Sequence, residues 1–489
     1  MKTVNLGSRR EVFWDDYIID TDKTTAFHRI MQPKKMEECF KFDQGGELLR
    51  PNFLNILKTD EGYNMYYLAS RTLNHMPKGP YSAYVAVIQS KDGIHWTRPS
   101  LNICTPAEDV EYPQLDVNNI VIEYCLDGML VFRDENPACP PEELYKIVGL
   151  RKLSNEDPKR ILAYWISHDG LHFKEGGVIT EEGAFDSLNT VIWKDGRYVC
   201  YFRSAQPRTQ LSPDRENKFR SISVIYSNDF KNWTEPKALE YDDDIEYDLY
   251  TNNIIQYERA PHMMIGFPAR YFDHNTGWSD NMEQMISGAH KKRAAEISEI
   301  RRVGLAITDS IFMCSRDGEL WHRYHSAFVD PGYENETNWV YGSNFLAYNF
   351  IDSGRENYYF YDIEGPRDFY NPRYLRRYEI RKDGFACIMA DGGTMLSDGE
   401  KVVVTKPIVF DSNDLHINFS TSAFGYIYVD VLDEDGNPLS DKQSVKIFGS
   451  NIDRVVRFND GSNFTEYKGK AIRLRFRMLD AKLFSMKFE

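Results

Sequence analysis

Short apolar runs with alternating polar positions recur along most of the chain, and several end in the same phrase. The phrase reads Ser-x-Asp-Gly-x-x-Trp/Phe, with Phe230 in place of Gly in one copy and a degenerate fifth copy at 381–385. Asp-Gly favours a tight turn, because Gly tolerates positive φ and Asp accepts hydrogen bonds within its own turn. We therefore predict a β-hairpin at the edge of a repeated sheet for each full copy: 90–96, 167–173, 227–233 and 315–321.

A further pair of apolar strands precedes each hairpin. Together, the pair and the hairpin give four strands, which is one blade of a β-propeller. The repeated phrase counts the blades, and here it predicts five of them over residues 40–390. The strand pairs are 52–57 with 63–69, 130–132 with 144–148, 188–193 with 198–202, 253–257 with 262–267, and 345–351 with 358–361.

The fifth unit lacks a fourth strand after Phe385. Residues 27–33 resemble the outer strand ends at 96–99 and 233–236, so we predict that they complete this blade and close the ring. Residues 281–302 are charged and amphipathic, and they predict a helical insertion on the propeller rim. This insertion is a candidate surface for homo-oligomer formation.

The repeated phrase stops near residue 402, and alternating strands separated by Asp-Gly turns follow. They predict a small β-sandwich. The sequence thus indicates an all-β protein, with a five-bladed β-propeller at 1–396 and a β-sandwich at 397–489. The sandwich strands are expected at 415–419, 426–431, 455–458, 472–478 and 483–488.

The composition fits this picture and narrows the partners. With 31 Tyr and 29 Phe, the chain is rich in residues that suit a pleated sheet. The formal net charge of −15 argues against nucleic acid and against anionic membrane surfaces as partners. The plainer interpretation of this charge is solubility.

The seven Cys are scattered, odd in number and without a CxxC pair, so neither a disulfide framework nor a zinc site is indicated. The 11 His show no metal-ligand spacing, and no nucleotide-binding motif is present, so we expect no cofactor. The N-terminus has no apolar signal region and no long apolar run follows. This predicts a cytoplasmic protein, or a periplasmic or secreted one if a signal was removed.

A five-bladed propeller followed by a β-sandwich resembles glycoside hydrolases of families 32, 43 and 68. Residues 131–134 resemble the Arg-Asp-Pro motif of family 32, although Glu135 and Asn136 precede the proline. Residues 364–366 resemble the Glu-Gly-Pro acid motif of family 43, but they follow the second strand of their unit. Phe13-Trp14-Asp15-Asp16 stands where family 32 has Trp-x-Asn-Asp-Pro. The nearest likeness is to an uncharacterised bacterial group called family 32-like.

This resemblance implies a carbohydrate substrate and, by analogy alone, a calcium ion in the propeller channel. Glycoside hydrolysis needs two carboxyl groups, one ionised and one protonated. We predict Asp134 and Asp186 for the ionised roles and Glu364 for the acid, with Asp16 and Asp248 in reserve. For each aspartate the plainer alternative is a turn or a cap.

Polar and aromatic residues at the strand ends are expected to line the propeller funnel. The arginines either pair with carboxylates and keep them ionised, or hold an anionic sugar through bidentate bonds. The aromatic residues either stack on sugar or pack in the core. The substrate-binding candidates are Arg50, Asn52, Arg71, Arg133, Arg203, Tyr250, Asn252, Arg270, Trp339 and Tyr341.

The leading hypothesis is a glycoside hydrolase that releases a terminal sugar. The alternatives are a non-catalytic propeller that binds a glycan or a protein, and a sugar lyase or phosphorylase. Carboxylate geometry separates the first two: opposed carboxyl groups favour hydrolysis, whereas a funnel in which every carboxylate is paired with arginine favours binding.

Overall fold

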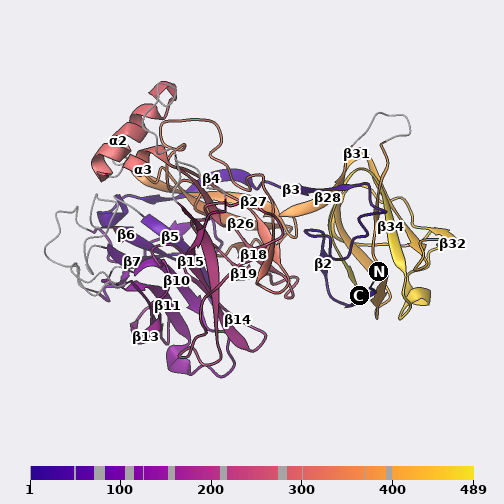
Figure 1. Ribbon diagram of the computed structural model, residues 1–489, viewed down its shortest axis with the longest axis horizontal. Coiled ribbons are helices and arrows are strands. Elements are labelled where there is room, and N and C mark those ends of the chain that lie inside the picture. Colours follow the sequence, from indigo (N-terminus) through magenta and orange to yellow (C-terminus); the bar gives the residue numbers. More distant parts are fainter. Residues whose placement is uncertain are drawn as a thin grey trace. The chain divides into compact units, whose positions relative to one another are not determined.

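The computed structural model describes residues 2–48, 51–70, 83–104, 115–124, 126–151, 160–209, 217–273, 283–299, 301–368, 371–391 and 399–489. The chain divides into two compact units, both built almost entirely of β-strands (Figure 1). The larger unit comprises Pro33–Gln256 and Met264–Glu379. The smaller unit comprises Met1–Gln32, Tyr257–Met263 and Ile380–Glu489.

The larger unit is a five-bladed β-propeller, which confirms the fold predicted from the repeats. In the first three blades the strands follow one another in sequence from the innermost outward. Blade one is β5 (Pro51–Thr59), β6 (Gly62–Ser70), β7 (Ala83–Ser90) and β8 (Trp96–Thr97), with β9 (Ile120–Ile122) on β7; blade two is β10 (Leu126–Arg133), β11 (Tyr145–Arg151), β12 (Ile161–Ser167) and β13 (Lys174–Thr180); blade three is β14 (Thr190–Lys194), β15 (Arg197–Pro207), β16 (Lys218–Ser227) and β17 (Lys237–Ala238).

Blades four and five each take a strand from elsewhere in the chain. In blade four an earlier strand, β18, pairs in parallel with the outermost one. Blade four is β19 (Ile255–Gln256), β20 (Met264–Gly266), β23 (Met313–Ser315), β24 (Leu320–Arg323) and β18 (Glu240–Tyr241), with β21 (Ala269–Phe272) and β22 (Ile307–Ser310) as a separate pair; blade five is β25 (Ile351–Asp352), β26 (Asn357–Glu364), β27 (Arg373–Arg381) and β4 (Lys34–Phe42).

An N-terminal strand therefore completes the last blade, but it is β4 rather than residues 27–33. The register of β4 on β27 is fixed by charge, since Glu37 and Glu38 pair with Arg377 and Arg376. Residues 27–33 offer no such carboxylates. Instead β3 (Phe27–Ile30) pairs with β28 (Ala386–Ala390) in the smaller unit.

The repeated phrase forms the turn between the third and fourth strands of a blade. In the first copy Asp92 Oδ1 accepts the backbone N–H groups of Ile94 and His95 at 2.8 and 2.9 Å. Ser90 Oγ accepts the N–H of Gly93, whose φ of 73° suits glycine. These bonds hold the pKa of Asp92 below its ordinary value although burial opposes them. The aspartates of the phrase thus stabilise turns.

Tyrosine hydroxyl groups of neighbouring blades donate hydrogen bonds to these turns. Tyr361 of blade five donates its hydroxyl to the Gly93 carbonyl of blade one at 2.6 Å. Tyr66 and Tyr201 do the same to Gly170 and Gly318 at 2.8 and 3.0 Å. In the third copy, where Phe230 replaces glycine, ring packing joins the blades instead, and Tyr164 of blade two lies 4.9 Å from Phe230 between ring centroids.

The smaller unit is a β-sandwich built around two long strands, β31 (Leu415–Leu432) and β34 (Arg473–Phe488), which pair along nearly their whole lengths. The N-terminal residues belong to its core, since Leu6, Phe13 and Ile18 are buried with Phe476 and Phe488. The expected boundary at residue 396 is therefore wrong. The other strands are β1 (Val4–Gly7), β2 (Glu11–Val12), β3, β28, β29 (Lys401–Val404), β30 (Ile408–Phe410), β32 (Pro438–Gln443) and β33 (Ser450–Val455).

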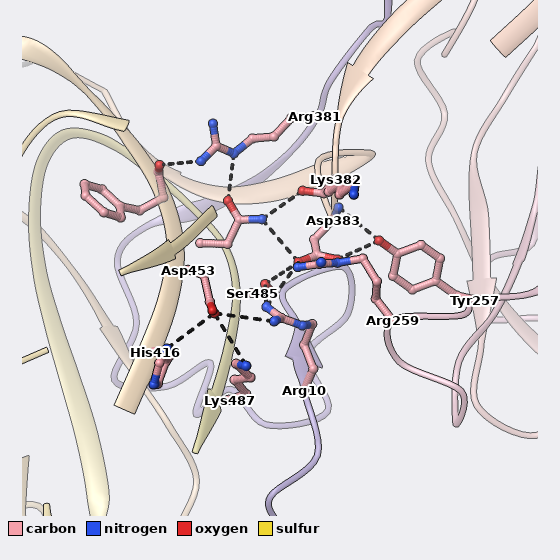
Figure 2. Close-up of polar contacts among 12 residues, drawn as sticks. Arg10, Tyr257, Arg259, Arg381, Lys382, Asp383, His416, Asp453, Ser485 and Lys487 are labelled. Carbon is pink, nitrogen blue, oxygen red and sulfur yellow. Dashed lines mark hydrogen bonds and ion pairs between the residues drawn. The ribbon is translucent and has the colours of Figure 1, made fainter. Parts of the chain in front are cut away.

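A buried carboxylate, Asp383, organises one side of the smaller unit (Figure 2). Arg259 binds it in bidentate fashion at 2.8 and 3.1 Å, and Tyr257 and Ser485 each donate a hydroxyl at 2.6 Å. Burial raises the pKa of Asp383, but Arg259, Arg10 and Ser485 together lower it to about 2. Asp383 belongs to the degenerate fifth copy of the phrase. Unlike the aspartates of the full copies, it binds arginine side chains as well as stabilising a turn.

Two helices occupy the segment that the sequence assigned to a rim insertion, α2 (Gly288–Ser298) and α3 (Arg301–Leu305). Ala294 and Val303 pack on the buried rings of Tyr250, Tyr271 and Tyr341. The helices therefore cover residues that precede the inner strands, and not only the rim. Short 3₁₀ helices lie at Gly45–Leu48, Pro141–Glu143 and Thr465–Tyr467.

Candidate functional site

The five inner strands run in the same direction around the axis of the propeller. The last residues of β5, β10, β14 and β19 line one common pocket with residues 348–349, which lead into β25. We call this the far end of the propeller. The opposite end, where the inner strands begin, is the funnel end.

Asp186 lies at the funnel end, directly before β14, as predicted. It forms an ion pair with Arg203 of β15 and lies 3.3 Å from the Arg160 guanidinium. Burial raises the pKa of Asp186, but the two arginines outweigh this effect and keep the pKa below its ordinary value. Asp186 is thus a carboxylate that stays ionised in a largely water-excluded position.

Arg203 connects this carboxylate to a cluster of aromatic rings. Its guanidinium lies 4.9 Å from the ring centroid of Tyr250. Tyr250 stacks on Phe345 and Tyr271 at 5.3 and 6.0 Å and meets Tyr341 edge-on at 5.5 Å. Tyr250 and Tyr341 are buried, whereas Trp339, the other aromatic candidate for sugar stacking, is half-buried.

Asp248 is the second predicted carboxylate that lies at the funnel end. It binds Arg208, and it accepts both the backbone N–H of Arg220 at 2.9 Å and its guanidinium at 3.2 Å. Arg220 also lies 4.4 Å from the ring centroid of Tyr271. Asp248 therefore joins the same network of arginines and rings as Asp186.

Arg270 is paired rather than available for a substrate carboxylate. It stands directly opposite Asp309 in the antiparallel pair of β21 and β22, with two bonds of 2.6 and 2.9 Å. Asp309 raises the pKa of Arg270, although burial opposes it. Arg203 and Arg270 are thus each paired with a carboxylate.

Glu364, the predicted acid, ends β26 and is bound by Lys35 at 2.7 Å and by Arg376. Burial raises its pKa, but these two cations keep it below the ordinary value, which does not suit a proton donor. Asp362, two residues earlier, is buried and accepts the backbone N–H of Ile363 at 2.7 Å. Burial raises the pKa of Asp362 to about 7.

Asp134 lies at the far end, because β10 begins at Leu126 and Asp134 follows its last residue. It is buried and accepts hydrogen bonds from Lys146 Nζ at 2.6 Å and Tyr198 at 2.8 Å. The predicted pairing of Asp134 with Asp186 in one funnel is therefore wrong. Its neighbour Arg133 lines the far-end pocket.

The remaining candidates are spread over the chain. Asn252 is buried and bridges blades, since its amide donates to the carbonyls of Leu188 and Tyr201 at 2.9 and 3.2 Å. Asp16 belongs to the smaller unit, where it pairs with His28. Asn52 is the second residue of β5 and accepts the N–H of Phe53, and Trp339 donates to the Gly332 carbonyl. Arg50 and Arg71 lie outside the described residues.

Asp309, Asp362 and Arg220 are funnel-end residues that the sequence interpretation missed. Asp362 lies two residues before Glu364, the first residue of the family 43-like phrase, and residues two apart in a strand share a face. This spacing could have indicated Asp362. Asp309 lies in β22 opposite Arg270 of β21, and no local sequence pattern marks it, because the register of the two strands is set by the fold.

One group of metal-ligating residue types is present among the described residues, and it lies in the smaller unit. His416, Asp453 and Glu489 bring ligand atoms within 4.8 Å of one another. Arg10 and Lys487 lie 3.6 and 3.7 Å from Asp453 (Figure 2), so two cations already compensate this carboxylate. The arrangement does not favour a bound cation, and a channel calcium ion stays a prediction.

No protein-family model matches the chain, and no curated protein matches it. Similar solved structures include an N-acetylgalactosamine deacetylase from F. plautii (12% identity over 74% of this chain and 96% of that one, TM-score 0.40). Others are an α-L-arabinofuranosidase from Fusarium graminearum (10%, 71% and 98%, 0.41) and a glycosyl hydrolase from Bacteroides ovatus (11%, 76% and 94%, 0.39).

Identities and TM-scores this low leave the function to be argued from the site itself. The resemblance to families 32, 43 and 68 stays a prediction. No helix among the described residues is long and apolar enough to span a membrane.

Proposed function

We propose that the chain is a glycoside hydrolase whose catalytic centre lies at the funnel end of the propeller. One observation carries the proposal: two carboxyl groups at this end have surroundings that drive their pKa values apart. Arginines hold Asp186 ionised, whereas burial raises the pKa of Asp362 to about 7. Acid–base cleavage of a glycosidic bond requires such a divergent pair, placed on opposite sides of the scissile bond.

In this proposal Asp186 is the nucleophile or base, and Asp362 replaces Glu364 as the proton donor. Asp186 is already ionised, so it needs no activating base of its own. Asp362 holds its proton near neutral pH and releases it to the leaving oxygen.

The substrate class follows from charge. Arg203 and Arg270 are each compensated by a carboxylate, so these two arginines do not call for an anionic sugar. We propose a neutral terminal sugar.

A second candidate is a non-catalytic glycan-binding propeller. It is favoured by a specific observation, namely that Asp186, Asp248 and Asp309 are all paired with arginine. Such pairing also serves a rigid binding surface that performs no chemistry.

The test is a hydrolysis screen of a glycan library with product analysis by NMR. Asp186→Asn is expected to lower turnover on a released sugar by about 10³-fold, because the ionised carboxylate is lost. Asp362→Asn is expected to lower it similarly on substrates with a poor leaving group. Wild-type turnover should fall as pH rises above about 7, where Asp362 loses its proton.

The matched control is Asp309→Asn, which alters a paired funnel-end carboxylate without an assigned role and should keep turnover within about tenfold. Folded Asp186→Asn and Asp362→Asn proteins with wild-type turnover would show that the assignment is wrong. Binding of a glycan by calorimetry, with no release from any furanoside, pyranoside or uronide, would establish the second candidate instead.

A further inference from the structure

The far end of the propeller carries a pocket that the proposed hydrolase does not use. Its volume is about 640 Å³, and all five blades contribute to its lining. Ligand pockets in proteins typically measure about 300 to 1,000 Å³. We call it the axial pocket.

The axial pocket has a buried aliphatic floor and a charged rim. Ile56, Val131 and Val191 lie deep in the inner strands and are buried. The rim is formed by residues at the strand ends, where the chain emerges into solvent. The rim residues with polar or aromatic groups are Lys58, Asp60, Arg133, Glu135, Tyr145, Trp193, Gln256 and Asn349.

Four charged side chains lie on the rim of the axial pocket. Within the part of the chain that the structure describes, Lys58, Asp60, Arg133 and Glu135 form no ion pair. At the funnel end, in contrast, Arg203, Arg208, Arg220 and Arg270 are bound to carboxylates. Charged side chains of both signs that form no such ion pair are available to a ligand in the pocket.

A second depression continues from the axial pocket. It measures about 710 Å³ and shares Thr59, Asp60 and Tyr145 with the axial pocket. It runs over the turns of blades one and two, and His95 and Asp169 of the repeated phrase line it. We call the two depressions together the far-end groove.

We propose that the far-end groove binds a neutral oligosaccharide chain, as a site separate from the funnel end. On the rim of the axial pocket, two cations and two carboxylates cancel in net charge. The second depression adds Lys91 and three carboxylates, which disfavours an anionic ligand. Two of these carboxylates, Asp92 and Asp169, already accept backbone N–H groups of their own turns. Adjacent donors and acceptors match the hydroxyl pairs of sugars, and the Trp193 and Tyr145 rings offer apolar faces for stacking. The elongated groove suits several consecutive sugars better than one.

The proposal does not depend on hydrolysis. Isothermal titration calorimetry would measure binding of cellohexaose, xylohexaose, mannohexaose and arabinohexaose to the full chain. Trp193→Ala and Arg133→Ala are each expected to weaken binding of the preferred hexasaccharide by about tenfold or more, as truncation of an anchor residue does. Arg133 is exposed and forms no ion pair, so its replacement should leave folding intact.

Two controls separate this groove from the other end of the ring. Asp309→Asn should bind as tightly as wild type, because it alters a funnel-end residue that has no assigned role. Lys231→Ala should also bind normally, since Lys231 is an exposed lysine in the turn of blade three and lines neither depression.

Three results would overturn the proposal. One is that no hexasaccharide binds. Another is binding that survives both groove substitutions but is lost in Asp186→Asn, which assigns it to the funnel end. The third is that only inorganic phosphate or glucuronate binds, in a manner lost in Arg133→Ala, which would make the groove an anion site.

Discussion

Asp362 and Asp383 are both buried aspartates, and their neighbours give them opposite charge states. Asp383 receives Arg259, Arg10 and two hydroxyl groups, and its pKa falls to about 2. Asp362 receives backbone N–H groups but no cation close enough to offset burial, and its pKa rises to about 7. Burial alone therefore does not decide the ionisation of a carboxyl group; the groups that replace water do.

Asp383→Asn is expected to destabilise the smaller unit by about 2 to 3 kcal/mol at pH 7, because one pKa unit corresponds to about 1.4 kcal/mol. The folded-state pKa of about 2 lies below the ordinary value of 3.8, so this stability is present above about pH 4 and is lost as pH falls through 2. Urea unfolding followed between pH 7 and pH 2 should show the difference between variant and wild type shrinking in acid.

Asp435→Asn serves as the control for this series, since Asp435 is an exposed turn residue of the same unit. It should shift stability by less than about 0.5 kcal/mol. A pH-independent effect of Asp383→Asn would mean that packing, rather than charge, accounts for the role of Asp383.

Individual site residues were predictable only where the strand end was identified correctly. Asp186 directly precedes an apolar strand, and the structure puts it at the funnel end as expected. Asp134 was predicted at the start of an inner strand because it belongs to a phrase that resembles a family 32 motif. The strand begins earlier, at Leu126, so Asp134 follows its end. The ion partners of Arg203 and Arg270 come from other strands, and a single sequence contains no signal for that register.

At the scale of elements, the repeated turn joins local and neighbouring contacts in one motif. Its serine and aspartate close the turn, and its glycine carbonyl receives a tyrosine of the adjacent blade. The glycine is required twice, for its positive φ and for the close approach of that tyrosine. These two roles account for the glycine in three of the four full copies; in the remaining copy Phe230 adopts a φ of 64° and joins the blades by ring packing.

Gly170→Ala is expected to destabilise the propeller by about 2 kcal/mol or more, because a Cβ there would add left-handed strain and meet Tyr66 Oη at 3.1 Å. Gly196→Ala is the matched control. Gly196 has a similar φ of 81°, but nothing lies within 4 Å of its Cβ position, so strain of about 1 kcal/mol is expected alone. Chemical denaturation of both variants would measure the difference.

Equal losses in the two variants would show that the tyrosine contact adds nothing to the backbone strain.

The elements themselves were largely predictable, since period-two alternation and Asp-Gly turns are local signals. The edge strand of blade five was not, because β4 and residues 27–33 look alike in isolation. Only the glutamates opposite Arg376 and Arg377 distinguish them.

At the scale of the whole molecule, the two units are interleaved in sequence. The smaller unit draws on three separate segments, of which Tyr257–Met263 lies between two strands of blade four. Repeat counting located the propeller, because repeats are local in sequence. It did not reveal which unit the N-terminal residues join, because that depends on contacts across almost the whole chain.

A chain of residues 1–396 is expected to aggregate, because its first 32 residues would lose the core partners supplied by β31 and β34. A chain of residues 33–379 keeps the strands of all five blades except the last two residues of β27, and it is expected to stay monomeric and folded. Size-exclusion chromatography and far-UV circular dichroism would compare the two. A well-folded, monomeric 1–396 chain together with an aggregated 33–379 chain would contradict the division into units.

The pairing of β4 with β27 also has a consequence during synthesis of the chain. About 340 residues separate the two strands, so β4 leaves the ribosome long before its partner exists. At about 5 to 20 residues per second the delay is roughly 20 to 70 s. Throughout that interval the strand is an unpaired edge, the kind of surface that recruits chaperones or other nascent chains. The three Lys and two Glu residues of β4 give the unpaired strand charges that discourage such encounters.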